Sequence, residues 1–107
     1  MSAALDKTLT ALADPSRRRV IDLLRKRPRR AGELSDALSM SAPAMSRHLR
    51  MLRKSGLVLE EIDEGDARIR VYRLRREPFT RLRDWLVEID AFWGDQLASL
   101  KEHLDRR

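Results

Sequence analysis

The chain has 107 residues, of which 42% are hydrophobic and 37% are charged, so it is long enough for one helix-rich globular domain and too apolar to be disordered. Its net charge of +6 is unevenly placed: residues 1–77 carry 18 Lys or Arg and 11 Asp or Glu, whereas residues 78–107 carry five Lys or Arg and six Asp or Glu. This distribution predicts a polyanionic partner for the first part and a protein partner for the second. The absence of cysteine excludes disulfides, thiolate metal sites and thiol redox sensing.

Two short helices are predicted at the start of the chain. Leucines recur at helical spacing over residues 1–12, which indicates an amphipathic helix. Asp14 is a good N-cap and Pro15 fits the first helical position, so a second helix begins there. This helix ends before Pro28.

A pair of helices joined by a tight connection is predicted next. Residues 31–38 form a short helix, and residues 39–41 connect it to a further helix that Ser41 caps. The helix that Ser41 caps buries a face of three apolar residues and stops at Gly56, a residue suited to the left-handed conformation just past a helix end. Two helices with about three residues between them are typical of a helix-turn-helix.

The periodicity changes after Gly56. Residues 57–62 and 68–74 are rich in β-forming types and flank a turn-forming cluster, which predicts a β-hairpin. In the second strand Ile69 and Val71 alternate with Arg68 and Arg70. We therefore expect one side of this strand to pack on the helices and the other to carry positive charge outward.

A long amphipathic helix is predicted from Pro78 towards the C-terminus. Apolar residues recur at steps of three and four from residue 82 to residue 104. Such a helix would span roughly 40 Å, longer than a domain of this size can cover, so part of its apolar stripe is expected to meet a second subunit. We assign eight apolar residues of the first and last helices to a dimer interface: Leu5, Leu9, Trp85, Ile89, Phe92, Trp93, Leu97 and Leu100. An effector pocket lined by the aromatic residues is the alternative.

The exposed side of the helix that Ser41 caps is basic and narrow. Its predicted surface residues are Pro43, Ser46, Arg47, Arg50 and Lys54. These residue types suit a helix in the major groove of DNA, because Arg reads guanine edges, Ser donates or accepts, and Lys neutralises phosphate. An ordinary solvated helix face is the alternative, but the preceding turn and the following hairpin favour DNA binding.

Two further basic groups accompany this helix. Arg68, Arg70 and Arg73 of the hairpin form a candidate wing that reaches the minor groove or its phosphates, although arginines on an exposed strand also protect its edge from pairing. Residues 17–30 carry eight Lys or Arg, and of these Arg29 and Arg30 are the nearest to the helix-turn-helix. We expect those two to contact the sugar-phosphate backbone and others of the group to be solvated.

Nothing in the sequence supports catalysis or a cofactor. There is no Gly-rich phosphate loop, and His48 and His103 are isolated, so we expect neither enzyme activity nor a metal. The remaining metal hypothesis is a site between two C-terminal helices that combines His103 with Glu102 or Asp105. The N-terminus has no signal-peptide pattern and no apolar run could span a membrane, so a cytoplasmic protein with no membrane partner is expected.

Three segments carry a family resemblance over nearly the whole chain. They are ALADPSRRRVIDLL at 11–24, SAPAMSRHL at 41–49 followed by Leu52 and GLV at 56–58, and RVYRL at 70–74. In this combination the sequence resembles the ArsR/SmtB family of winged helix-turn-helix repressors. Metal sensors of that family carry paired cysteines in the helix before the turn, where this chain has GELSD at 32–36. The chain therefore resembles the cysteine-free branch, which does not sense metals.

The resemblance implies a homodimer, built from the first and last helices, that binds an inverted-repeat operator and represses transcription by blocking polymerase. By matching position it implies base contacts from Ser41, Ala42, Ala44, Ser46 and Arg47. Family members often carry Gln at the position of Ala42, so no operator sequence is carried over. The resemblance also leaves room for a small-molecule effector of unknown identity.

The predicted organisation is a single winged helix-turn-helix domain over residues 1–107, mainly α with a small β-hairpin. It comprises a dimerisation helix at 1–13, a DNA-binding core at 14–77 with its wing at 57–75, and a C-terminal dimerisation helix at 78–105. The expected function is sequence-specific DNA binding in transcription regulation. A metal-responsive repressor of the same family and a winged-helix module that binds RNA or protein are the alternatives.

Overall fold

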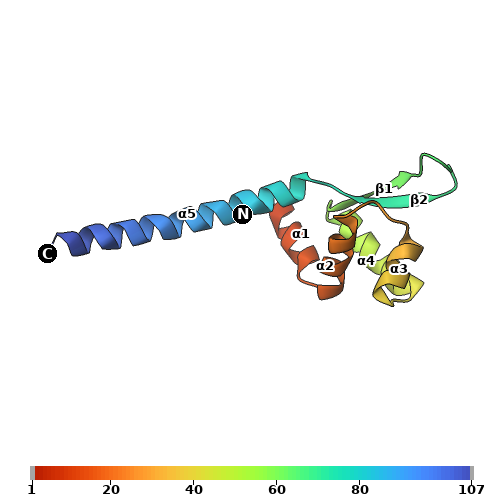
Figure 1. The fold of residues 1–107 in the computed structure, drawn as a ribbon, viewed down its shortest axis with the longest axis horizontal. Helices are drawn as coiled ribbons and strands as arrows, with labels where there is room; N and C mark the ends of the chain where they lie inside the picture. Colours follow the sequence, from red (N-terminus) through yellow and green to blue (C-terminus); the bar gives the residue numbers. More distant parts are fainter. Residues whose placement is uncertain (1, 107) are drawn as a thin grey trace.

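The computed structural model describes residues 2–106 and contains five helices and one two-stranded antiparallel sheet (Figure 1). The elements are α1 (Ala3–Leu12), α2 (Pro15–Leu24), α3 (Ala31–Leu38), α4 (Ala42–Lys54), β1 (Val58–Ile62), β2 (Arg70–Leu74) and α5 (Glu77–Asp105). Each lies within a few residues of its predicted segment, and the predicted class, mainly α with a small β-hairpin in a winged helix-turn-helix arrangement, is confirmed.

The predicted helix boundaries have the local chemistry that the sequence indicated. A carboxylate oxygen of Asp14 accepts hydrogen bonds from the backbone amides of Ser16 and Arg17 at 2.7 and 3.1 Å, which caps α2. The hydroxyl of Ser41 accepts from the amide of Ala44 at 3.2 Å and caps α4. Gly56 has φ of 77°, so it supplies the left-handed residue that ends this helix region.

The hydrophobic core lies between the short helices and the base of the hairpin. Its buried members come from α1 to α4 and from the first residues after α4: Ala11, Val20, Ile21, Leu24, Leu34, Met45, Leu49, Leu52, Leu57 and Val58. Because α4 buries one face in this core, its opposite face is held outward in a fixed orientation.

The strand register corrects one expectation about the hairpin. Val58 pairs with Leu74 and Glu60 pairs with Tyr72, and both Leu74 and Tyr72 pack against the core. The alternation of a β-strand therefore turns Val71 away from the core, although we expected its side to pack on the helices. Burial of the large side chains of Tyr72 and Leu74 against the core selects this register of β1 and β2.

The α2–α3 connection adds a third short stretch to the sheet. Arg29 and Tyr72 exchange two backbone hydrogen bonds, of 3.2 Å and 2.7 Å, in an isolated antiparallel bridge. This bridge connects the base of the hairpin to the body that carries α4. It therefore helps to fix the position of the hairpin relative to α4.

The long helix α5 projects from the body of the molecule (Figure 1). The chain measures 71 × 26 × 25 Å and has a radius of gyration of 19.2 Å. A compact domain of this length would have a radius of gyration of about 13 Å. Only the beginning of α5 lies beside α1, so most of α5 has no covering layer within the chain. No helix in residues 2–106 is long and apolar enough to cross a membrane.

Candidate nucleic-acid interface

The outward face of α4 consists of the small and basic side chains that were predicted there. Met45, Leu49 and Leu52 are buried on the inner side of the helix. The residues on the outer side and at the N-terminal end are exposed, apart from the half-buried Ala44: Ser41, Ala42, Pro43, Ala44, Ser46, Arg47, Arg50 and Lys54. The helix therefore has a narrow polar ridge that can enter a groove.

Three cations of this ridge are available to a ligand. Within residues 2–106, Arg47, Arg50 and Lys54 form no ion pair, whereas Arg53 lies 2.9 Å from Glu60 of β1. We call these three residues the basic face of α4. Two guanidinium groups and one ammonium group without carboxylate partners can donate to base edges and to phosphate oxygens without first breaking an internal contact.

The hairpin arginines differ, because each is held by a carboxylate. The pairs are Arg68 with Asp66 at 3.0 Å, Arg70 with Glu60 at 3.6 Å, and Arg73 with Glu61 at 3.0 Å. The hydrogen bond from Arg68 also keeps the pKa of Asp66 below its usual value. A phosphate would have to displace these carboxylates, so the wing is less cationic than its arginine content indicates.

Arg70 and Arg73 also lie on opposite faces of the hairpin. Arg70 pairs in register with Ile62, and Arg73 pairs with Leu59. The two arginines are three positions apart on β2, and residues an odd number of positions apart in a strand point to opposite faces. Arg68 precedes β2 and is strongly exposed, with 89% of its side-chain surface accessible. A single duplex approaching one face of the hairpin would therefore meet Arg70 and Arg73 unequally.

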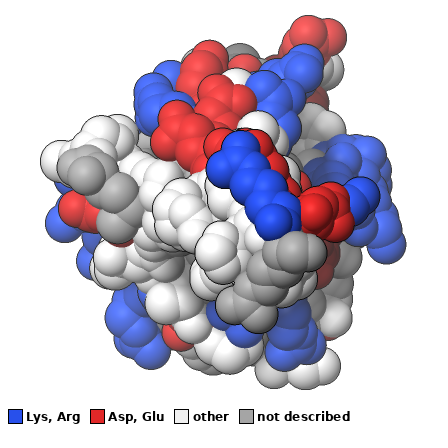
Figure 2. Space-filling view, turned by 90° about the vertical axis from the view of Figure 1, so that its left-hand side faces the viewer, with Lys and Arg blue, Asp and Glu red and all other residues white. Residues whose placement is uncertain are grey.

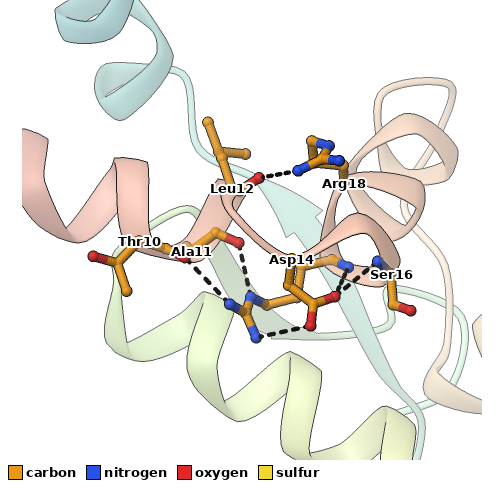
Figure 3. A network of polar contacts seen from close by, with 7 residues as sticks. Thr10, Ala11, Leu12, Asp14, Ser16 and Arg18 are labelled. Atoms are coloured by element: carbon orange, nitrogen blue, oxygen red, sulfur yellow. Dashed lines mark hydrogen bonds and ion pairs between the residues drawn. The ribbon is translucent and has the colours of Figure 1, made fainter.

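Two arginines at the start of α2 have a structural role that the sequence pattern did not reveal (Figure 3). Arg17 donates from Nε to the carbonyl of Ala11 at 2.7 Å and from Nη2 to that of Thr10 at 3.2 Å. Arg18 donates to the carbonyl of Leu12 at 2.6 Å. These side chains satisfy the free carbonyl groups at the end of α1 and join α1 to α2.

The two arginines expected to contact the sugar-phosphate backbone are also engaged within the chain. Arg29 is half-buried and donates from Nε to the carbonyl of Leu23 at 3.3 Å. Arg30 lies 4.0 Å from Glu33, whose carboxylate also accepts from the Arg30 amide at the start of α3. A backbone contact from Arg29 would compete with its internal hydrogen bond, whereas the exposed Arg30 has only a long, weak ion pair to lose.

Most of the residues assigned to a dimer interface lie exposed on α5. The exposed fractions are 37% for Ile89, 54% for Phe92, 61% for Trp93, 67% for Leu97 and 55% for Leu100. Leu86 and Leu104, which were not assigned, are exposed on the same stripe. Figure 2, which views the molecule from the C-terminal end of α5, shows uncharged side chains in the centre, with charged side chains over the top and right and along the lower edge.

The remaining assigned residues are less accessible. Leu9 of α1 and Trp85 of α5 are half-buried, and Leu5 is only 6% exposed because it is buried inside the subunit. Leu5 therefore packs within the subunit and offers little surface to a partner.

The residues named for a metal site between two C-terminal helices all lie on α5. No group of three or more His, Asp or Glu side chains that could hold a metal ion occurs within residues 2–106. His103, Glu102 and Asp105 all lie exposed near the end of α5.

Comparisons with known proteins agree with this geometry. Residues 14–59 match the family model for bacterial regulatory proteins of the arsR family. The chain is 34% identical to the HTH-type transcriptional regulator Rv2034 of Mycobacterium tuberculosis over 94% of this chain and 88% of that protein. It is also 30% identical to the transcriptional repressor SdpR of Bacillus subtilis, over 50% of this chain and 60% of that protein.

Solved structures extend the comparison to the fold. The ArsR family transcriptional regulator RHA00566 is similar with a TM-score of 0.75 and 32% identity, covering 85% of this chain and 97% of that one. A homodimeric winged helix-turn-helix DNA-binding domain from Mycobacterium bovis is similar with a TM-score of 0.64 and 26% identity, covering 97% and 84%. The chain therefore belongs to the ArsR family of DNA-binding transcriptional regulators, which are not enzymes.

Proposed function

We propose that the chain acts in the cytoplasm as a homodimeric, sequence-specific repressor of an inverted-repeat operator. The observation that carries the proposal is the basic face of α4, whose Arg47, Arg50 and Lys54 are exposed and unpaired within residues 2–106. A helix of this kind fits the major groove, where arginine distinguishes guanine from the other bases.

The proposed contacts divide into base readers and phosphate binders. Ser46 and Arg47 lie in the first half of α4 and are assigned to base edges, together with the small residues Ser41, Ala42, Pro43 and Ala44, which allow close approach. Arg50 and Lys54 follow along the same side and are assigned to base edges or phosphates. The wing residues Arg68, Arg70 and Arg73 are assigned to phosphates alone, because they must exchange a carboxylate for each contact.

A homodimer is proposed because α5 carries an apolar stripe that nothing in the chain covers. Trp93 and Leu97 are more than half exposed, and burial of such side chains is worth about 1.5–3 kcal/mol each. The similar domain from Mycobacterium bovis is described as homodimeric. Two copies joined along α5 would present two α4 helices to successive turns of the major groove, about 34–36 Å apart.

Repression is proposed as the outcome of this occupancy. A dimer that covers two half-sites one helical turn apart excludes other proteins from the same stretch of promoter. The similarity to the repressor SdpR supports this direction of regulation.

The proposal can be tested by selecting the genomic DNA fragments that the full chain binds. The expected result is a shared motif made of two inverted halves whose centres are one turn apart. The matched control is the double variant Arg47→Ala/Arg50→Ala, which should recover no motif. Fragments without a shared motif, or the same motif recovered by the variant, would contradict the proposal. Structured RNA that displaces the selected duplex as well as DNA does would favour the RNA-binding alternative.

A further inference from the structure

A second basic surface lies at the junction of α2, β2 and α5. A hollow of about 450 Å³ opens between the end of α2, the end of β2 and the start of α5. None of its lining residues belongs to α4 or to the tip of the hairpin. This junction hollow shares Arg73 with the wing residues assigned to phosphates, and its other lining residues lie outside the surface assigned to DNA.

The floor of the junction hollow is apolar. Leu24 is 4% exposed and belongs to the core, and Leu74 and Phe79 are partly buried against it. The hollow is shallow and open to solvent, and through these residues it borders the hydrophobic core. A floor of this kind favours an alkyl or aryl group over water.

The rim of the junction hollow is cationic. It carries six Lys or Arg side chains from two segments, residues 25–27 and 73–76. Three of these cations have a carboxylate partner outside the lining: Arg27 with Glu33 at 3.1 Å, Arg73 with Glu61 at 3.0 Å and Arg75 with Glu77 at 3.7 Å.

The other three rim cations have no such partner. Arg25, Lys26 and Arg76 form no ion pair in the part of the chain that the structure describes. The fold brings these like charges, two from just after α2 and one from just before α5, to the rim of one hollow. An anion placed there would gain charge-assisted hydrogen bonds without breaking an existing pair.

We propose that the junction hollow binds an organic anion with an apolar body, of the class of medium-chain carboxylates. Its apolar body lies on Leu24, Leu74 and Phe79, and its carboxylate lies among the unpaired cations Arg25, Lys26 and Arg76. Inorganic phosphate or a DNA backbone would satisfy the cations and leave the apolar floor in water. A neutral hydrocarbon would cover the floor and leave the cations unmatched.

The position of the site gives its occupant contact with two parts of the molecule. Arg76 immediately precedes α5, while Leu24 and Leu74 belong to the body that carries α4. A bound anion therefore touches both the body and the helix assigned to dimerisation. The inference concerns ligand binding alone and does not depend on the operator.

The test is a titration of the full chain with octanoate, followed through the backbone amide signals in nuclear magnetic resonance. Octan-1-ol and acetate serve as the chain-only and charge-only probes. The expected result is that shifts cluster in residues 24–28 and 73–79, and that octanoate binds at least about tenfold more tightly than either other probe.

Two matched double variants make the test specific. Arg25→Gln/Arg76→Gln should weaken octanoate binding by about tenfold or more, whereas Arg19→Gln/Arg81→Gln, which removes two exposed arginines outside the hollow, should leave it unchanged. Four results would overturn the proposal: no binding, equal binding of octan-1-ol, equal loss in the control variant, or shifts confined to other surfaces. If Arg25→Gln/Arg76→Gln lowered the affinity for duplex DNA and the control variant did not, the rim would be assigned to DNA, and the proposal would also be overturned.

Discussion

The carboxylate of Glu60 on β1 lies 2.9 Å from the guanidinium of Arg53 on α4. Its second oxygen lies 3.6 Å from Arg70 on β2, so one glutamate holds an arginine of α4 and an arginine of the hairpin. Arg53 is exposed beside Lys54 of the basic face of α4, and Arg70 is one of the wing residues assigned to phosphates. We therefore expect Glu60 to compete with phosphate for two cations and to weaken binding to every duplex.

Replacement of Glu60 by Gln should increase affinity for DNA of any sequence. Each exposed pair costs about 0.2–1 kcal/mol to break, so we expect a gain of several-fold. The plot of log K against log salt should also become steeper by about 0.9 for each arginine released to a phosphate. Fluorescence anisotropy with a labelled duplex at several salt concentrations measures both quantities.

Glu64→Gln is the matched control for this experiment. It removes one negative charge from the same hairpin, but Glu64 is exposed and forms no ion pair within residues 2–106. A smaller effect than that of Glu60→Gln is expected. Equal effects in the two variants would mean that overall charge, and not the paired arginines, limits binding.

Arg47→Ala should weaken binding to the best operator by about 1–3 kcal/mol and reduce discrimination at one base pair. The reason is that Arg47 is assigned to a base edge and is exposed on α4. Affinities for a set of singly substituted operators provide the measurement, with Arg19→Ala on α2 as the control. A loss of the same size on every sequence would reassign Arg47 to a phosphate.

Trp93→Glu should yield monomers and abolish operator binding, because it places a charge in the middle of the apolar stripe of α5, where Trp93 is 61% exposed. Light scattering measures the mass directly. Val87→Glu is the control, since Val87 is similarly exposed, at 58%, but lies about 120° away around the helix. A dimeric Trp93→Glu variant, or a monomeric Val87→Glu variant, would be inconsistent with an interface on this stripe.

Asp14→Ala should lower the midpoint of thermal unfolding, since it removes the acceptor of two amide hydrogen bonds at the start of α2. Asp14→Asn retains a capping oxygen and should lose less. The backbone hydrogen bond from Arg17, aided by that from Ser16, holds the pKa of Asp14 below its ordinary value of 3.8. The stabilisation by the carboxylate is thus complete above pH 3.8 and disappears as the pH falls through the lowered folded pKa.

Melting curves followed by circular dichroism at a series of pH values test this linkage. The difference in midpoint between the natural chain and Asp14→Ala should narrow in acid. A difference that stays constant until all carboxyl groups are protonated would show that the ionised form of Asp14 has no special role.

Helix boundaries were predictable because they depend on neighbouring residues. Asp14 and Ser41 cap the helices that follow them, and Gly56 adopts the left-handed conformation that its position required. The outward face of α4 was predictable for a similar reason, because three buried residues at helical spacing define the opposite side.

Contacts between distant segments were not predictable in this way. The partner of each wing arginine depends on strand register, which sets Glu60 and Glu61 diagonally opposite Arg70 and Arg73. The core-facing side of β2 was assigned wrongly because both sides of that strand contain apolar residues. The hydrogen bond from Arg17 to the carbonyl of Ala11 at the end of α1 depends on the angle between α1 and α2. The spacing of residues in the sequence carries no information about that angle.

In the proposed complex a dimer reads DNA with the basic face of α4. The affinity of the full chain for a selected duplex and for a scrambled duplex, measured over a range of salt concentrations, tests this proposal. The predicted result is a preference of about 10³-fold or more for the selected duplex, with a slope near −5 to −7 if the dimer neutralises about six to eight phosphates. Weak binding that is equal for both duplexes and indifferent to salt would contradict the claim.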